Sequence, residues 1–380
     1  MKQGWEYKKL GEVCCPKNKI QRAARCFDSS DKILYIDISS IDNTIQKVTD
    51  ITSVTFGDAP SRAQQKIEYG DIVVSTVRPN LKNIAIIDRY EPNIVASSGF
   101  CVLRNTECIE RNYLFHYVTS DIFTQHLMKI TTGANYPAVR DQDVRDSIIP
   151  LPPKSTQLAI VSELDKINEL ICLKKEQLKD FDNLAQSIFY EMFGDPVENE
   201  MGWEVKKLVE VSSLINGRAY KQNELLNEGK YKVLRVGNFF TNSNYYYSNL
   251  ELDDEKYCYK GDLLFAWSAS FGAFIWDEGK TIFHYHIWRV LFDEKNLNIY
   301  YYKYLLNTMT NFFMNDVHGI GMVHLTKAGM EQYNLPLPPL PLQHLFAHRI
   351  EQIEHQKSEV QNAITDLETL LASRMQYWFE

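Results

Sequence analysis

The sequence contains one ordered pattern twice, and this repeat constrains the fold more than any other feature. The segment GWEYKKLGEV at 4–13 returns as GWEVKKLVEV at 202–211, and PLPP at 150–153 returns at 336–339. In both halves the order is GWE, a long mixed stretch, PLPP and then a segment that is almost free of proline. The period is far longer than the 20–50 residues of solenoid repeats. It therefore indicates duplication of one domain together with the segment that follows it.

After each PLPP, apolar residues recur in alternating steps of four and three. In the first half these positions include Ile160, Leu164, Ile167, Ile171, Leu178, Phe181 and Ile188. An offset of 186 residues gives Phe346, Ile350, Ile353, Val360, Ile364, Leu367 and Leu371 in the second half. Charged residues interrupt the two stripes only at Lys174, Lys357 and Arg374. This spacing is typical of a coiled-coil seam, and it predicts one long helix in each half.

Such a narrow apolar stripe has to be buried against a partner, and the simplest partner is the other helix. Only about eight residues separate the end of the first helix, near Phe193, from the second GWE segment. The second domain must therefore begin where the first helix ends, and the second helix must run back along the first. This predicts an antiparallel pair about 48 Å long, at about 1.5 Å per residue, that holds two similar domains apart. A generic dimerisation coiled coil is the alternative interpretation of the seam alone.

The remaining segments are expected to be two similar, strand-rich α+β domains. Residues 1–150 and 202–335 would form the domains, 151–193 and 336–380 the two long helices, and 194–201 a linker. Short apolar runs bounded by turn residues predict strands. They lie at 71–77, 83–88 and 99–104 in the first domain, and at 262–267, 272–276 and 288–292 in the second. One amphipathic helix is expected in each domain, at 111–128 and at 298–314.

The composition excludes several classes of protein. With 44% hydrophobic and 24% charged residues, the chain is neither disordered nor fibrous. No apolar run approaches the roughly 18 residues of a membrane span, and the first residues lack the apolar core of a secretory signal. Seven cysteines without a C-x-x-C motif fit a reduced, cytoplasmic protein.

The sequence lacks the motifs of the common catalytic sites. It has no P-loop and no nucleophile elbow, and its PLPP segments lack the polar first residue of an amino-methyltransferase motif. His284 and His286 have no Cys or His cluster at zinc-ligand spacing, so we expect an ordinary surface pair and no metal. Asp262, Glu278 and Lys280 match a loose pattern of metal-dependent nucleases. That pattern arises easily by chance, and the first half has no full counterpart.

Polar residues near the predicted strand ends indicate recognition of nucleic acid. In the first domain the candidates are Arg62, Gln64, Arg78, Asn80 and Lys82, with Asn135, Tyr136 and Arg140 in a loop before the first long helix. In the second domain they are Ser268, Ser270, His318, His324 and Lys327. Arginine reads guanine edges and Asn or Gln reads adenine edges by paired hydrogen bonds, while Lys and Ser contact phosphates. For any one of these residues, an ordinary surface polar group is an equally good interpretation.

Taken together, these segments resemble the DNA-specificity subunit of type I restriction–modification systems. The resemblance rests on GWE..KKL, on SRAQQKIEYGDIVVSTVRPNLKNIAII followed by SSGFCVLR, and on PLPP-x-x-x-Q before each long helix. It covers nearly the whole chain. The second domain departs more, because it has WSASFG where the first has TVRPNLKN, so the resemblance does not identify a DNA target.

The resemblance implies two target recognition domains, each of which reads one half of a split, asymmetric site in double-stranded DNA. The helical pair would set the unread spacer. Two modification subunits, each with S-adenosylmethionine, would dock on this chain and methylate one adenine in each half-site. Restriction subunits that use ATP and Mg could join them. Catalysis would lie in these partners, so this chain would be no enzyme and would hold no cofactor.

Two other interpretations stay open, namely a fragment of a fused single-chain restriction or methylation enzyme, and a coiled-coil scaffold with no role on DNA. The net charge of −8 does not exclude DNA binding, because −7 lies in 151–199 and 336–380, and residues 1–150 and 200–335 together have only −1. Near-neutral domains nevertheless lack a strong field for phosphates. We therefore expect this subunit alone to bind DNA weakly and its partners to supply much of the affinity.

Overall fold

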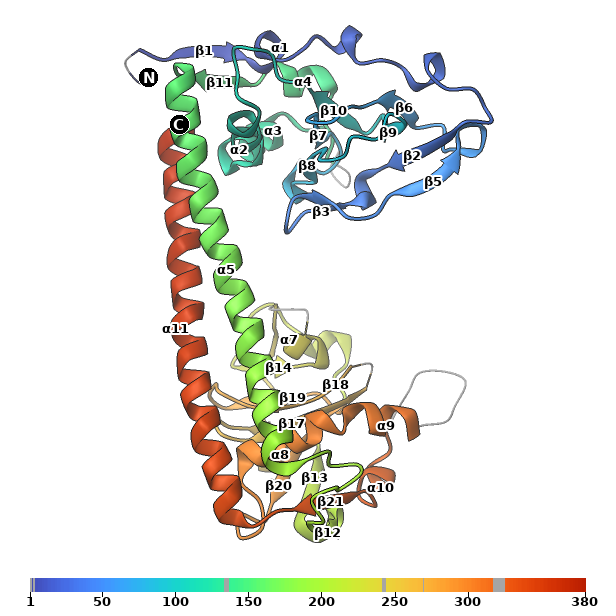
Figure 1. Ribbon diagram of the computed structural model, residues 1–380. Helices are drawn as coiled ribbons and strands as arrows, with labels where there is room; N and C mark the ends of the chain where they lie inside the picture. The colour runs from blue at the N-terminus through green and yellow to red at the C-terminus, as the bar shows by residue number, and fades with distance from the viewer. Residues whose placement is uncertain (1, 3, 133–136, 241–243, 269, 317–324) are drawn as a thin grey trace. The chain divides into compact units, whose positions relative to one another are not determined.

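The computed structural model describes residues 2, 4–132, 137–240, 244–268, 270–316 and 325–380, and it divides into two compact units (Figure 1). Unit 1 consists of Met1–Lys175 and Asn362–Glu380, and unit 2 of Glu176–Gln361. Each unit combines a strand-rich domain with parts of two long helices, α5 (Lys154–Phe193) and α11 (Leu340–Phe379). The predicted mixed fold, with strand-rich domains and long helices, is confirmed.

The domain of unit 1 contains short strands in several small sheets. The largest has the order β5 (Thr52–Thr55), β2 (Lys32–Ile36), β9 (Ile94–Ser97), β6 (Ala63–Lys66). The next has the order β10 (Phe100–Leu103), β7 (Ile72–Ser75), β8 (Ile84–Ile86). Two-stranded pairs join β1 (Glu6–Lys9) to β11 (Ile148–Leu151) and β3 (Ile41–Asp42) to β4 (Lys47–Val48). The helices of this domain are α1 (Leu10–Val13), α2 (Arg111–Thr119), α3 (Asp121–Ile130) and α4 (Asp141–Arg145).

The domain of unit 2 has a closely similar set of elements. One sheet has the order β15 (Tyr246–Ser248), β14 (Tyr231–Leu234), β19 (Thr281–Phe283), β16 (Tyr257–Cys258). The other has the order β13 (Ser212–Asn216), β20 (Ile287–Phe292), β17 (Leu263–Ser268), β18 (Ser270–Ile275). A separate pair joins β12 (Glu204–Lys207) to β21 (Asn334–Leu337). The helices are α6 (Leu208–Val211), α7 (Val236–Phe240), α8 (Ile299–Thr308), α9 (Thr310–Asp316) and α10 (Lys327–Met330).

Pairing and turns show that the two domains repeat one plan. The central pair of the mixed sheet is parallel in both, β2 with β9 and β14 with β19. The turn before β7 and the turn before β17 each contain a left-handed glycine, Gly70 with φ +88° and Gly261 with φ +96°, a conformation that glycine adopts without steric cost. The next residue in each turn, Asp71 or Asp262, accepts a hydrogen bond at 2.8 Å from the backbone N–H three residues earlier. The duplication is therefore present in the fold.

The two sequence landmarks of each repeat pair with each other as strands. The GWE segment leads into β1 or β12, and the PLPP segment begins within β11 or β21, so that Tyr7 lies opposite Pro150 and Val205 opposite Pro336. These are isolated two-stranded pairs, where a proline costs little because an edge strand need not donate every hydrogen bond. The sequence identified both landmarks but not that they close each domain on itself.

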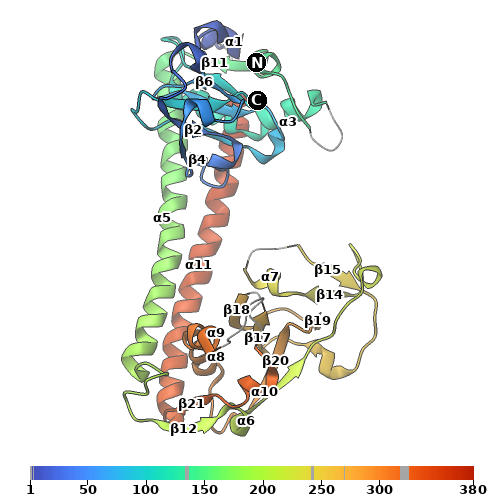
Figure 2. The ribbon, with the colours of Figure 1, turned by 90° about the vertical axis from the view of Figure 1, so that its right-hand side faces the viewer.

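The two long helices are antiparallel within each unit. They are joined by the ion pairs Glu163–Arg374 and Lys175–Glu368 in unit 1, and Asp182–Lys357 in unit 2. In unit 1, a later residue of α5 pairs with an earlier residue of α11, as an antiparallel pair requires. Figure 2 shows α5 and α11 side by side. The predicted direction of the pair is confirmed.

The predicted seam is largely buried. Its buried residues are Ile160, Leu164, Ile167, Ile171, Phe346, Ile350, Ile353, Val360 and Ile364. Its half-buried residues are Leu178, Phe181, Ile188, Leu367 and Leu371. Toward the helix ends the seam also enters the domain cores: Ile160 and Leu164 pack with Tyr113 in unit 1, and Phe346 and Ile350 pack with Tyr301 in unit 2. The stripe therefore packs against the domain cores as well as against the other helix, which was expected as its simplest partner.

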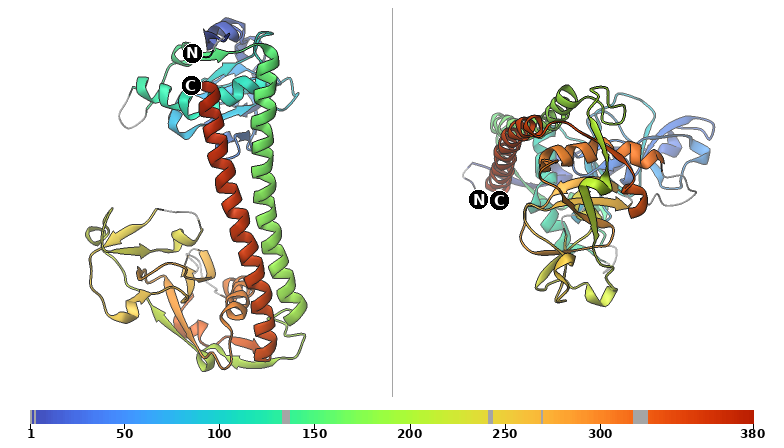
Figure 3. Two further views of the ribbon diagram at one scale, coloured as in Figure 1. Left: turned by 90° about the vertical axis from the view of Figure 1, so that its left-hand side faces the viewer. Right: turned by 90° about the horizontal axis from the view of Figure 1, so that it is seen from below.

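The end of α11 is part of the core of unit 1. Phe379 is 4% exposed and lies 5.4 Å from Tyr113 and 5.6 Å from Tyr117, measured between ring centroids. Trp378 stacks on Trp5 at 6.1 Å. Figure 3 accordingly shows the marks for the two chain ends next to each other. Unit 1 is thus assembled from two stretches of chain that are far apart in the sequence.

The expectation of one amphipathic helix per domain is wrong, because each predicted helix is broken into two. Between α2 and α3 the chain becomes extended at Ser120 (ψ 153°), whose hydroxyl accepts a hydrogen bond from Phe123 N and caps α3. In unit 2, α8 ends at Thr308, and α9 begins after Met309. The apolar periodicity continues across both breaks, and it therefore did not indicate them.

Candidate nucleic-acid interface

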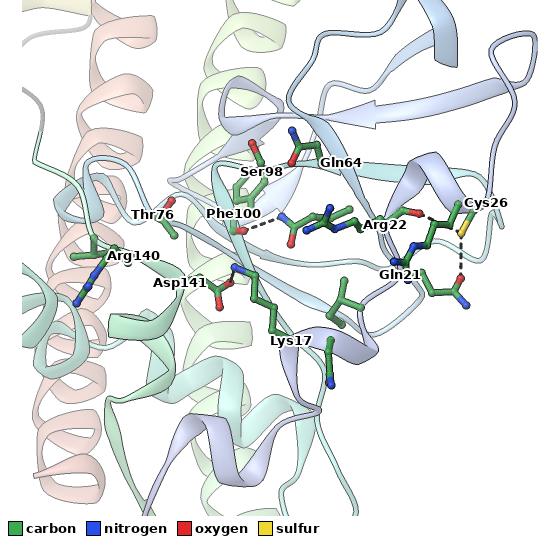
Figure 4. Close-up of a pocket in the computed structure, with 15 residues that line it drawn as sticks. Lys17, Gln21, Arg22, Cys26, Gln64, Thr76, Ser98, Phe100, Arg140 and Asp141 are labelled. Atoms are coloured by element: carbon green, nitrogen blue, oxygen red, sulfur yellow. Dashed lines mark hydrogen bonds and ion pairs between the residues drawn. The ribbon is translucent and has the colours of Figure 1, made fainter.

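A cavity with a volume of about 990 Å³ lies in the strand-rich domain of unit 1. We call it the first cleft. It is lined by most of the segment 17–26, by Gln64 and Gln65 of β6, by Thr76 and Ser98 in loops, by Phe100 of β10, and by residues 139–141 before and at the start of α4. Figure 4 shows these side chains around the cleft. Polar and basic groups predominate, as recognition of a base edge or a phosphate requires.

Backbone and amide hydrogen bonds fix the walls of the first cleft. The chain at Gln21 and Arg22 runs beside β6, because Lys66 N donates to Gln21 O at 2.9 Å and Arg22 forms an isolated bridge with Gln65. The Nε2 group of Gln65 donates to Ser97 O and to Phe100 O, each at 2.9 Å. Gln65 therefore ties β6 to the loop between β9 and β10. The backbone that carries the side chains of Arg22 and Gln64 is therefore fixed by these hydrogen bonds.

The first cleft has arginines with no acidic partner. Arg22 and Arg25 are exposed, and no carboxylate among the described residues lies within ion-pair distance of either. Lys17 is 3.5 Å from Asp141, which also holds Arg145 at 2.9 Å. An unpaired guanidinium is available for paired hydrogen bonds to a guanine edge or a phosphate.

Three of the predicted residues of the first domain lie at or beside this cleft. Gln64 lines it, and its Nε2 donates to Ser61 O at 2.9 Å. Arg62 is exposed, and its carbonyl accepts from Ser98 N at 2.7 Å. Arg140 lines the cleft, but its guanidinium donates to Asp143 at 2.8 Å and points away from the other labelled side chains in Figure 4. The hydrogen bonds from Arg140 lower the pKa of Asp143. The Arg140 guanidinium is therefore bound to a residue in the first turn of α4.

The other predicted residues of the first domain lie at the short 3₁₀ turn Pro79–Leu81. Arg78 and Lys82 flank it in left-handed conformations, with φ 49° and φ 50°. Lys82 is tied to the domain helices, since its ammonium is 2.6 Å from Asp121 and 3.1 Å from Thr119 O. Arg78 and Asn80 are exposed. Asn135 and Tyr136 lie outside the described residues.

The predicted residues of the second domain are less uniform. Ser268 is 3% exposed, which leaves little of its hydroxyl accessible, whereas Ser270 across the hairpin turn is half-buried. Lys327 lies 3.7 Å from Glu331 and lines a cavity of about 400 Å³ with Trp267, His286 and other residues. His318 and His324 lie outside the described residues.

Sequence reasoning missed the segment KNKIQRAAR at 17–25, which forms one wall of the first cleft. A signal was present, because six of the nine side chains in the segment are basic or amide and none is acidic. It was overlooked because it belongs to neither the repeat nor a predicted strand.

The described residues offer no metal centre. Nowhere in the described part of the chain do three His, Cys, Asp or Glu side chains gather as metal ligands. Asp262 holds the turn before β17 and lies 3.6 Å from Arg289, while Glu278 pairs with Lys232. Asp262 and Glu278, the two carboxylates of the nuclease-like pattern, therefore make separate structural contacts. None of the helices in the described ranges is both apolar and long enough for a bilayer.

The fold is therefore one strand-rich domain present twice, and each copy has a cavity lined by polar, basic or aromatic side chains. The chain belongs to the family of type I restriction modification DNA specificity domains, whose model matches residues 2–180 and 200–368. The two matches coincide with the two repeats.

Comparison with individual proteins agrees with this assignment. The chain is 24% identical over 194 residues to the type I restriction enzyme HindI specificity subunit of Haemophilus influenzae, with 50% of this chain and 41% of that protein covered. It therefore spans less than half the length of this relative. It is 23% identical to the putative MjaX specificity subunit of Methanocaldococcus jannaschii, with 93% and 87% covered. A solved chain from a study of complex assembly and conformational transition of the type I R-M system has 27% identity and a TM-score of 0.64, with 100% and 98% covered.

Proposed function

We propose that the chain is the sequence-reading subunit of a type I restriction–modification complex and that it recognises a bipartite, asymmetric site in double-stranded DNA. Each strand-rich domain reads one half of the site, and α5 with α11 sets the number of unread base pairs between the halves. The duplication supports this most directly, because one strand plan occurs twice and both copies offer a cavity with side chains suited to bases. This function implies a protein that works in the cytoplasm.

Two modification subunits, each with S-adenosylmethionine, are proposed to dock on this chain and to methylate one adenine in each half-site. An apolar exterior of the helices supports a protein partner, since Leu170, Leu173 and Leu370 in unit 1 are 47%, 53% and 45% exposed. A contiguous patch of exposed apolar side chains would mark a surface that another protein covers. Restriction subunits that use ATP and Mg join the complex when it cleaves. In this proposal the chain itself is no enzyme and holds no cofactor.

Methylome sequencing tests the proposal. In cells with the gene, N6-methyladenine is expected in a two-part motif with unspecified bases between the parts. Deletion of this gene alone should abolish methylation at that motif, and return of the gene should restore it. An unchanged methylome would contradict the proposal and favour the scaffold. Methyl transfer to DNA by the purified chain alone, with added S-adenosylmethionine, would favour the fused-enzyme alternative.

A further inference from the structure

Strand register identifies one loop of unit 2 as the counterpart of a loop in the first cleft. Within unit 1, β7 and β10 pair with Ile72 opposite Leu103, and within unit 2, β17 and β20 pair with Leu263 opposite Val290. Four residues after the start of β7 and of β17, the backbone N–H donates an equivalent hydrogen bond in the two units. Thr76 N donates to Gly99 O at 2.9 Å. Its counterpart is Trp267 N, which donates to His286 O at 3.1 Å. Residues 97–99 therefore correspond to 284–286.

The two loops occupy the same position but have different chemistry. The loop of unit 1 is Ser-Ser-Gly, and Ser98 lines the first cleft. The loop of unit 2 is His-Tyr-His, and it contributes to a cavity of about 260 Å³ that we call the second cleft. The side chains with polar atoms that line the second cleft are those of Arg235, Asn238, Asn244, Tyr246, His284 and His286. The imidazoles of His284 and His286 are 4.8 Å apart, measured between ring centroids.

Arg235 is the principal charged group of the second cleft. It is exposed, its guanidinium lies 5.4 Å from the ring centroid of Tyr246, and no carboxylate of the described residues is within ion-pair distance. A guanidinium held over an aromatic face loses less conformational freedom when its N–H groups bind a planar ligand.

Contacts around α7 hold Arg235 in place. The Oδ1 atom of Asn238 accepts from Arg235 N at 2.8 Å, and its Nδ2 donates to Asn244 O at 3.0 Å. Phe239 stacks on Phe274 of β18 at 4.2 Å between ring centroids. Asn238 is therefore a positioning residue, and Arg235 stands at the anchored start of a helix.

His284 provides a neutral hydrogen-bonding group in the second cleft. The Nδ1 atom of His284 accepts from His286 N at 3.4 Å, which leaves its Nε2–H as the donor. Burial lowers the pKa of His284 to about 4, so the ring is uncharged near neutral pH. A neutral imidazole can donate to a base acceptor without adding a charge that would attract phosphate indiscriminately.

We propose that Arg235, with His284 and His286 beside it, forms the base-reading site of the second domain and that Arg235 recognises a guanine. The two outer N–H groups of its guanidinium match the O6 and N7 acceptors on the major-groove edge of guanine. This assignment rests on the proposed function and adds to it a ligand, one guanine in the half-site of the second domain.

The test uses the complete system, with the full chain and its own modification subunits. Wild type, Arg235→Gln, Arg235→Lys and Lys295→Gln are each expressed in cells that lack the gene, and the methylated motif is sequenced. Lys295 is exposed in the same unit, so Lys295→Gln removes an equal charge away from the second cleft. Each purified complex is also tested for binding to the wild-type site and to sites with each guanine replaced.

We expect Arg235→Gln to relax one guanine position in one half of the motif, with discrimination there falling roughly 10- to 100-fold, and the other half to stay unchanged. Arg235→Lys should relax the same position, because lysine lacks the planar fork. This variant keeps the positive charge, and it provides the test if Arg235→Gln does not fold. Lys295→Gln should keep the wild-type motif. An unchanged motif in both Arg235 variants, or equal weakening at all sequences, would overturn the guanine assignment alone. A wild-type complex without any bipartite motif would overturn the proposed function as well.

Discussion

The buried side-chain amides of Gln157 and Gln343 make the same hydrogen bonds at the start of the two long helices. The Nε2 group of each donates to the third residue of its PLPP segment, to Pro152 O at 2.9 Å or to Pro338 O at 2.8 Å. The Oε1 atom of each accepts the backbone N–H of the N-cap residue of α2 or α8, at 2.7 and 2.8 Å. One glutamine therefore fastens each long helix to its domain, which explains the glutamine of the PLPP-x-x-x-Q motif.

Replacement of Gln343 by leucine should destabilise unit 2. The change leaves the backbone N–H at the N-cap of α8 without a partner in the core, and a buried unsatisfied group costs about 1–3 kcal/mol. We expect the free energy of unfolding to fall by about 2–4 kcal/mol, because carbonyl groups lose their donor as well. Urea denaturation of the full chain measures this. Gln356→Leu on the exposed side of the same helix is the control and should change stability little.

Replacement of Arg22 by glutamine should alter recognition of the half-site read by the first domain. Arg22 lines the first cleft without a carboxylate partner among the described residues, so a lost base contact should cost about 1–3 kcal/mol of discrimination. Arg140→Gln is the matched comparison, since the guanidinium of Arg140 is already bound to Asp143. Sequencing of the methylated motif should show a change in one half for Arg22→Gln and a smaller one for Arg140→Gln. The opposite order would argue against Arg22 as a reader.

The ion pair between Glu163 and Arg374 should make the stability of unit 1 depend on pH in the acid range. Hydrogen bonds from Arg374, and then from Trp378 Nε1 at 3.1 Å, lower the pKa of Glu163 below its ordinary value of 4.5. A depressed pKa stabilises the fold above the ordinary value, and this contribution is lost as the pH falls through the lower value of the folded state. The stability difference between wild type and Glu163→Gln should therefore be at most about 1 kcal/mol at pH 7 and should vanish in acid. A difference that grows in acid would contradict this assignment.

Replacement of Phe379 by alanine should destabilise unit 1. The ring is 4% exposed and packs on Tyr113 and Tyr117, and loss of a buried phenylalanine costs about 3–5 kcal/mol. Thermal unfolding of the full chain should show a lower midpoint for the transition of unit 1. Tyr377→Ala, at a neighbouring position that is 55% exposed, is the aromatic control. Equal effects of the two changes would show that Phe379 is not a core residue.

Insertion of one heptad into each long helix, after Lys175 in α5 and before Asn362 in α11, tests the spacer proposal. Seven residues add about 10 Å of helix at about 1.5 Å per residue. DNA rises about 3.4 Å per base pair, so the unread spacer should lengthen by about three base pairs while both half-sites stay the same. Sequencing of the methylated motif measures this. An altered half-site would contradict a role of the helices in spacing alone.

Regular periodicity made the long helices and several strands predictable from the sequence. The seam spacing predicted helices at 151–193 and 336–380, and the structure has Lys154–Phe193 and Leu340–Phe379. The strand predicted at 71–77 is Ile72–Ser75, and that at 288–292 is Ile287–Phe292. In these segments local pattern and tertiary packing agree. The PLPP residues at the start of the two predicted ranges are not helical, since Pro150 and Pro336 belong to strands whose partners are distant in the chain.

The candidate site was only partly predictable, because a cleft depends on contacts that sequence spacing does not encode. Gln64 was found from its place near a strand end, but Arg22 reaches the same cleft through pairing with β6. Lys82 was predicted to contact DNA, and its ammonium lies 2.6 Å from Asp121. His284 and His286 were expected to be an ordinary surface pair, and the structure places both at a cavity beside Arg235. Pairing of distant segments decided each of these outcomes.

The place of Phe379 in the core of unit 1 has a consequence for the order in which the chain folds during its synthesis. Unit 2 is one continuous stretch, Glu176–Gln361, and it emerges from the ribosome before the residues that complete unit 1. At about 5–20 residues per second, translation of this stretch takes on the order of 10–40 seconds. For that time the first half of α5 is without the part of α11 on which it packs, and its apolar stripe is open to chaperones or to a second nascent chain. The first domain to be translated is thus the last to be finished.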